Sequence, residues 1–174
     1  SCITGTVGKS RTDNRNEEHT MPLTDFLVPE GVLPQLRATS KKQVLRELSD
    51  QAGSILKLES RSIFEALLQR ERLGSTGIGK GIAIPHGKFG DLPKLCGLFA
   101  RLEKPIDFEA LDHEPVDLVF LLLAPENAGT DHLKALAKIA RILRDPSTVQ
   151  ALRHSRDQNA LYALLTRIPN SHAA

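Results

Sequence analysis

The sequence predicts an α/β protein, a three-layer α/β/α sandwich with a mixed β-sheet flanked by helices on both faces. Two observations support this fold class. Residues 116–125, VDLVFLLLAP, are apolar almost throughout, which is typical of a strand that is covered on both faces. Segments of strand and helix character also follow one another in the order β-α-α-β-β-β-α-α-α, which supplies helices for both sides of one sheet.

The first part of the predicted fold is one strand and two helices. The short apolar segment at residues 31–36 has the character of a strand. Residues 39–53 begin with Ser/Thr capping chemistry and end on Gly53, and both features favour a helix. Residues 60–74 repeat this pattern, with apolar side chains at helical spacing and Gly74 as the stop.

The second part is three strands followed by three helices. The strands are expected at residues 81–87, 95–106 and 116–125. The helices are expected at residues 129–145, 146–155 and 156–168. The first of these helices is strongly amphipathic. Its inward face is expected to carry Leu133, Leu136, Ala137, Ala140 and Leu143.

One domain accounts for the patterned part of the chain. No internal repeat and no Pro/Gly-rich linker divides residues 23–168, and the length suits one domain. Residues 1–22 are polar and carry few large apolar side chains, so we expect a leader, a tag or a disordered arm there. Residues 169–174 are expected to form a C-terminal tail.

Composition argues against several classes of function. Lys and Arg total 23 against 21 Asp and Glu, so the chain lacks the basic excess that drives nucleic-acid binding. The longest apolar run falls short of the roughly 20 residues of a membrane helix. The two cysteines and six histidines show no spacing typical of a metal site or a disulfide framework. We therefore expect a cytoplasmic protein with no metal, no cofactor, no nucleic-acid partner and no insertion into a membrane.

The glycine-rich run GSTGIGKGIAIPHGK, residues 74–88, is the most unusual stretch of the sequence. It matches most of a phosphate-binding P-loop, but Gly81 stands where that motif requires Ser or Thr. The run also follows a helix and enters a strand, which is the reverse of the P-loop order. A bound nucleotide is therefore disfavoured.

His86, near the end of this run, is the leading candidate for chemistry. Pro85 restricts the backbone before it and Gly87 allows a turn after it, so the ring is expected at a strand end. A neutral imidazole is a competent nucleophile, and glycine amides can surround a phosphoryl group. The alternative is that His86 only packs or caps a turn. The candidate phosphoryl-binding loop is Ser75, Thr76, Gly77, Gly79 and Gly87.

Two further side chains are candidates for the same site. His132 lies in the first turn of the helix that follows residues 116–125. It would meet His86 if that strand and the strand at 81–87 ran parallel; the alternative is a surface cap. Arg70 stands four residues before the glycine run and could offer a guanidinium to phosphoryl oxygens. The alternative is an exposed arginine at a helix end with no role in the site.

The segments RERLGSTGIGKGIAIPHGK and KPIDFEALDHEPVDLVFLLLAPENAGTDHLKALAKIARIL resemble enzyme IIA of the bacterial phosphotransferase system. The resemblance is to the fructose/mannitol superfamily, closest to its nitrogen-regulatory type, and extends over residues 23–168. It implies that His86 accepts a phosphoryl group from the phosphohistidine of a small histidine-containing phosphocarrier protein. It also implies that His132 assists at the transition state and that Arg70 stabilises the phosphoryl group.

The resemblance implies a phosphotransferase component that acts as a regulator through phosphorylation-dependent protein binding. Its targets would be proteins such as potassium transporters or sensor kinases. One alternative is a sugar-transport enzyme IIA that passes the phosphoryl group to a IIB domain. Another is a non-catalytic protein-binding module in which His86 is structural. The sequence leaves open which imidazole nitrogen is phosphorylated; the nitrogen remote from the backbone, as in tele-phosphohistidine, is the candidate.

Overall fold

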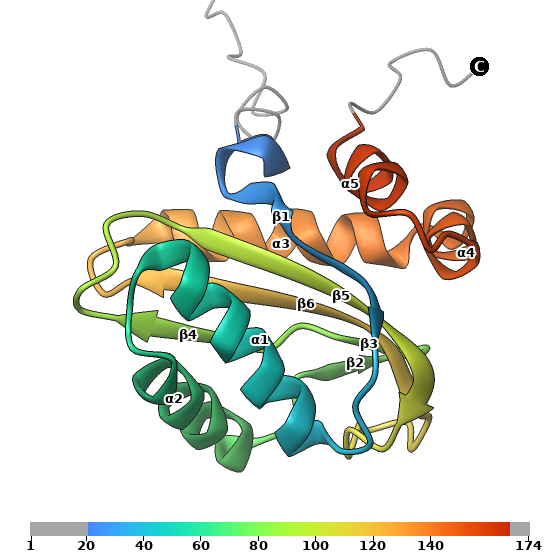
Figure 1. Cartoon of the computed structure of the whole chain (residues 1–174), viewed down its shortest axis with the longest axis horizontal. Coiled ribbons are helices and arrows are strands. Elements are labelled where there is room, and N and C mark those ends of the chain that lie inside the picture. Colours follow the sequence, from blue (N-terminus) through green and yellow to red (C-terminus); the bar gives the residue numbers. More distant parts are fainter. Residues whose placement is uncertain (1–20, 168–174) are drawn as a thin grey trace, which may run out of the picture.

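The computed structural model describes residues 21–167, and it has the predicted three layers (Figure 1). Most of the leader expected at 1–22 and the tail expected at 169–174 lie outside these residues. A 3₁₀ turn at Leu23–Asp25 precedes the sheet. The strands are β1 (Leu27–Leu36), β2 (Gly77–Gly79), β3 (Ile82–Ala83), β4 (His86–Phe89), β5 (Cys96–Ile106) and β6 (Val116–Pro125). The helices are α1 (Lys41–Leu56), α2 (Ser60–Leu73), α3 (Thr130–Arg144), α4 (Pro146–His154) and α5 (Gln158–Thr166).

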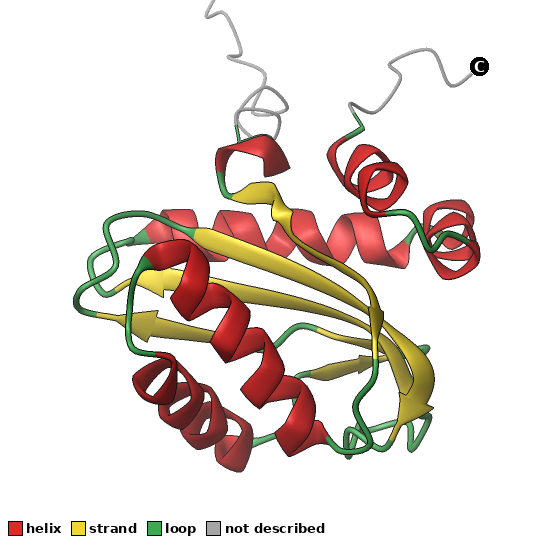
Figure 2. Ribbon diagram, viewed as in Figure 1, coloured by secondary structure: helices red, strands yellow, loops and turns green. Residues whose placement is uncertain are grey.

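The strands form one mixed sheet in the order β1-β5-β6-β3-β2, and β4 also pairs with β6. β5 is antiparallel to β6, whereas β3 and β4 run parallel to β6. Figure 2 shows the strands of this sheet between helices. The predicted fold class is therefore confirmed. No helix among the described residues is long and apolar enough to cross a bilayer.

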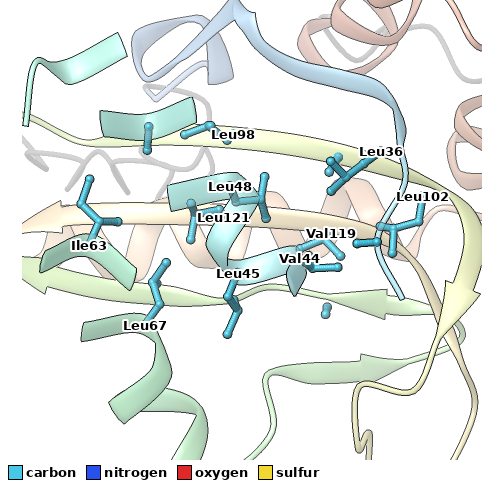
Figure 3. Packing of buried hydrophobic residues seen from close by; sticks show 14 of the residues in the cluster. Leu36, Val44, Leu45, Leu48, Ile63, Leu67, Leu98, Leu102, Val119 and Leu121 are labelled. Atoms are coloured by element: carbon cyan, nitrogen blue, oxygen red, sulfur yellow. The ribbon is translucent and has the colours of Figure 1, made fainter. Parts of the chain in front are cut away.

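β6 lies between two hydrophobic cores because its side chains alternate between the two faces of the sheet. On one face Val119, Leu121 and Leu123 pack with residues from α1 and α2. Figure 3 shows Leu45 and Leu67 of these helices in the same cluster. On the other face a second cluster joins β6 to α3, α4 and α5. The nearly unbroken apolar sequence of β6 follows from this double burial.

Several predicted elements differ in the structure. β1 begins at Leu27 and not at residue 31, and the short strand β2 was not predicted. The strand expected at 81–87 is two strands, β3 and β4, separated by Ile84 and Pro85. Pro85 has no N–H to donate, but its carbonyl accepts a hydrogen bond from the N–H of Leu122 at 3.0 Å. The helix expected to stop at Gly53 continues to Leu56. A Cβ at Gly53 would lie 2.8 Å from the carbonyl oxygen of Leu58, so this glycine permits a close approach and does not end the helix.

The buried face of α3 also differs from the prediction. Leu133 is 65% exposed and Ala137 is exposed, while Leu136 and Ala140 are only partly buried. Of the predicted inward residues, only Leu143 is fully buried. The inward face is shifted by about one position, because a histidine that the apolar pattern does not count occupies a buried place on it. The buried residues of α3 are His132, Ala135, Ile139 and Leu143.

Candidate active site

His86 is the first residue of β4, beside Leu122 of β6 in parallel register. Its Nδ1 lies 2.9 Å from the carbonyl oxygen of Ile84. A carbonyl oxygen can only accept, so Nδ1 carries the proton and Nε2 keeps its lone pair. The ring is half-buried, and this burial is the main cause that lowers the pKa of His86 below its ordinary value of 6.5.

The structure brings His132 next to His86. The two ring centroids are 5.6 Å apart and the ring planes are inclined by 54°. β4 and β6 run parallel, which is the condition expected from the sequence, and α3 carries His132 to the start of β4, where His86 lies. His132 is buried, and within residues 21–167 its Nε2 has no hydrogen-bond partner. Burial, followed by the charges of His86 and Lys88, lowers the pKa of His132.

Arg70 lies in the last turn of α2, near enough to His86 to act on it electrostatically. Its Nη1 donates a hydrogen bond of 2.9 Å to the carbonyl oxygen of Gly74, at the start of the glycine run. The positive charge of Arg70 contributes to the lowered pKa of His86. The guanidinium is thus close enough to His86 for its charge to disfavour the protonated ring.

The hydroxyl groups of the predicted phosphoryl-binding loop are engaged within the protein. Ser75 Oγ donates to the carbonyl oxygen of Phe108 at 2.8 Å and accepts from the N–H of Gly77 at 3.1 Å. The hydroxyl of Thr76 donates to Glu71. These contacts hold the shape of the loop, and they occupy the Ser75 and Thr76 hydroxyls and the Gly77 N–H within the protein.

The two remaining glycines of that loop lie apart from each other. Gly87 follows His86 within β4, next to the ring. Gly79 has a φ of +96°, and the turn at residues 79–81 that joins β2 to β3 is built from positive φ values, which glycine adopts without strain. A Cβ at Gly79 would lie 3.1 Å from Asp112. Gly79 therefore shapes the hairpin, and Gly87 is the loop residue next to His86.

Glu71, which the sequence did not single out, is buried and only 7% exposed. Its carboxylate pairs with Lys41 at 2.7 Å, which ties the end of α2 to the start of α1. In the sequence, Glu71 stands between two arginines at a helix end, where an exposed side chain is the usual expectation. The spacing Ile63, Leu67, Glu71 is the indication that could have revealed it, because it places the carboxylate on the buried face of α2.

Residues 25–168 match the family model for "Phosphoenolpyruvate-dependent sugar phosphotransferase system, EIIA 2". A nitrogen regulatory protein of Bradyrhizobium diazoefficiens is 57% identical over 153 residues, which is 88% of this chain and 100% of that protein. The crystal structure of nitrogen regulatory protein IIA-Ntr from Neisseria meningitidis superimposes with a TM-score of 0.79 at 35% identity, over 83% of this chain and 99% of that one.

The mannitol IIA protein of Escherichia coli shares the fold, with a TM-score of 0.69 at 24% identity. That match covers 79% of this chain and 97% of the other. The paired histidines therefore lie in a fold found among phosphotransferase components. By its family match and by its identity to the Bradyrhizobium protein, the chain belongs to the EIIA 2 family of the phosphoenolpyruvate-dependent sugar phosphotransferase system.

Proposed function

We propose that the chain accepts a phosphoryl group on Nε2 of His86 from the phosphohistidine of a small histidine-containing phosphocarrier protein. The observation that carries this proposal is the hydrogen bond from Nδ1 to the Ile84 carbonyl oxygen, which leaves Nε2 as the nucleophilic nitrogen. The neutral ring that the lowered pKa favours is the reactive form. We assign this role to one domain, residues 23–168.

The transfer exchanges one nitrogen–phosphorus bond for another. The lone pair of His86 Nε2 attacks phosphorus while the bond to the carrier's imidazole breaks, and that electron pair returns to the carrier's ring nitrogen. The proton on Nδ1 of His86 stays where the Ile84 carbonyl holds it. When the other nitrogen of the carrier's ring holds a proton, that ring leaves as neutral imidazole and no proton has to cross between the proteins. The site then mainly has to position the His86 ring and bind the phosphoryl oxygens.

His132 and Arg70 are suited to bind those oxygens. Nε2 of His132 is buried and unpaired among the described residues, and a hydrogen bond to a phosphoryl oxygen would satisfy it when this nitrogen carries the proton. The guanidinium of Arg70 offers further donors and a full positive charge. Both groups would interact most strongly with the charge spread over the transferring phosphoryl group.

The proposed output is regulatory. Phosphorylation would add up to two negative charges and three strong acceptors beside α3, which is enough to admit or exclude a docked protein. The nitrogen regulatory proteins that the chain resembles favour this output over sugar transport. We propose that target proteins such as potassium transporters or sensor kinases distinguish the two states, in the cytoplasm.

The test is the intact mass of the chain after incubation with the phosphorylated carrier protein. We expect a gain of about 80 Da that is lost in acid, and we expect no gain for His86→Ala. His113→Ala is the matched control, because this exposed histidine lies in the turn before β6, and it should gain the same mass as the wild type. A wild-type chain that gains nothing from an active carrier would favour the non-catalytic binding module.

A further inference from the structure

Glu71 is the one carboxylate that is buried among the described residues, and the proposed chemistry does not use it directly. Carboxylates are rarely this buried unless they are paired. Its Oε2 accepts from Lys41 Nζ at 2.7 Å and from the N–H of Thr76 at 3.2 Å, and its Oε1 accepts from the Thr76 hydroxyl. Two of these three hydrogen bonds come from a single residue of the glycine run.

Thr76 connects this carboxylate to the backbone that holds His86. The carbonyl oxygen of Thr76 accepts from the N–H of Ile84 at 2.9 Å. The carbonyl oxygen of Ile84 in turn accepts from Nδ1 of His86 at 2.9 Å. An unbroken series of hydrogen bonds therefore runs from Lys41 through Glu71, Thr76 and Ile84 to the imidazole ring.

We propose that Glu71 is a positioning residue for phosphoryl transfer: through Thr76 and Ile84 it fixes the orientation in which His86 donates from Nδ1 and presents Nε2. This inference deepens the proposed function and rests on it. Thr76 is held at its N–H and hydroxyl by one carboxylate and at its carbonyl by Ile84, so it cannot shift without breaking several hydrogen bonds. Rigid support of this kind is what an accurately oriented nucleophile requires.

Lys41 completes the arrangement. Its side chain is 16% exposed, lies over the ring of Phe108 and neutralises the carboxylate. The same Phe108 offers its carbonyl oxygen to Ser75, the neighbour of Thr76. The start of α1 and the segment after β5 therefore hold Glu71 and the loop from two sides. Removing the carboxylate would leave the buried Thr76 N–H and the Lys41 ammonium without this partner.

The test compares Glu71→Gln with Glu65→Gln. Glu65 lies on the same helix but is exposed and forms an ion pair with Arg61, so it controls for the loss of a negative charge on α2. Single-turnover transfer from the phosphorylated carrier gives the rate at saturation and the carrier concentration at half saturation. For Glu71→Gln we expect the saturated rate to fall about tenfold to a hundredfold while the half-saturating concentration changes by less than about twofold. Glu65→Gln should match the wild type.

A second measurement follows the ring without any transfer. Two-bond ¹H–¹⁵N correlations identify which nitrogen of His86 is protonated, and Glu71→Gln should move these shifts away from the single Nδ1–H form. Thr76→Val removes only the hydroxyl donor. It should change the saturated transfer rate and the ring shifts in the same direction as Glu71→Gln does, and Thr76→Ser should restore the wild-type values. Thr76→Val also serves if Glu71→Gln does not fold.

The outcomes separate this inference from the proposed function. If Glu71→Gln is less stable but keeps the wild-type saturated rate and ring shifts, Glu71 only stabilises the fold and the inference is wrong. If the wild type accepts no phosphoryl group, the proposed function fails, whereas the ring shifts of the unphosphorylated variants still decide whether Glu71 orients His86.

Discussion

His86 and His132 show how burial prepares two ordinary side chains for one reaction. In both, the transfer of the imidazolium out of water is the main cause that lowers the pKa below 6.5. The environment therefore favours the neutral form of each ring. A neutral His86 is the nucleophile, and a neutral His132 can stand 5.6 Å from it without charge repulsion.

This environment predicts the pH dependence of both rings. Histidine ¹⁵N titrations should place both midpoints below 6.5 in the folded protein, and near 6.5 in concentrated urea. Because the unfolded chain then binds more protons just below pH 6.5, these histidines lower stability as the pH falls from 6.5 through their folded pKa values. Above 6.5 the effect vanishes. Folded midpoints above 6.5 would contradict the burial argument.

His132→Ala should slow transfer without preventing it. Removing one preorganised donor to a charged transition state costs about a hundredfold in rate, and the nucleophile itself is unchanged. We expect the saturated transfer rate from the phosphorylated carrier to fall by about this factor, with the final extent of phosphorylation preserved over a longer time. An unchanged rate would remove His132 from the reaction.

At the residue scale, the sequence predicted the reacting histidines better than the buried carboxylate that supports them. Pro85 and Gly87 single out His86 because they constrain only the local backbone. Glu71 was missed because its partners, Lys41 and Thr76, lie 30 residues before it and 5 after it, and only packing reveals that they converge. The helical spacing of Ile63, Leu67 and Glu71 could indicate that the carboxylate is buried, but it does not identify the partners of the carboxylate.

At the element scale, α3 offers a matched test of which face is buried. Leu143 is 1% exposed and Leu133 is 65% exposed on the same helix. Leu143→Ala should lower the free energy of unfolding by about 2–5 kcal/mol, because it leaves a cavity in the core. Leu133→Ala should change it by less than about 0.5 kcal/mol. Urea unfolding checks both, and a larger loss for Leu133→Ala would reverse the assignment.

Most helices and strands could be predicted from the sequence. Which face of a helix is buried, and where a strand is interrupted, could not. Caps are local: Ser40 accepts from the N–H of Gln43 at 3.1 Å, as the capping chemistry indicated. Which face of α3 is buried depends on His132. This side chain is buried because it belongs to the site, and not because it is hydrophobic. The split of the 81–87 segment at Pro85 depends on pairing with β6.

At the scale of the whole molecule, β6 couples the two cores, and this predicts cooperative unfolding. The chain contains one tyrosine and no tryptophan, and Tyr162 packs in the α3–α5 core. Leu121 is fully buried in the opposite core. Leu121→Ala should destabilise the protein by about 2–5 kcal/mol and shift the Tyr162 fluorescence transition as far as the circular dichroism transition. A fluorescence transition that stays in place would show that the layers unfold separately.

The layers could be predicted from the sequence, whereas the strand order could not. Amphipathic helices before and after the apolar β6 segment require both faces of a sheet to be covered. The order β1-β5-β6-β3-β2 depends on pairs between distant segments, such as β1 with β5, that local patterns do not encode. The additional pairing of β4 with β6 matters for function, because it places His86 beside Leu122, and the His86 ring contacts that of His132 from α3.

The most direct test of the central claim is to locate the phosphorus in the phosphorylated protein. The ¹⁵N-labelled full chain, phosphorylated by its carrier, would be examined by ³¹P and long-range ¹H–¹⁵N correlations. We expect the phosphorus on Nε2 of His86, with Nδ1 still protonated and bound to the Ile84 carbonyl. Phosphorus on Nδ1 of His86, or on another residue, would contradict the account.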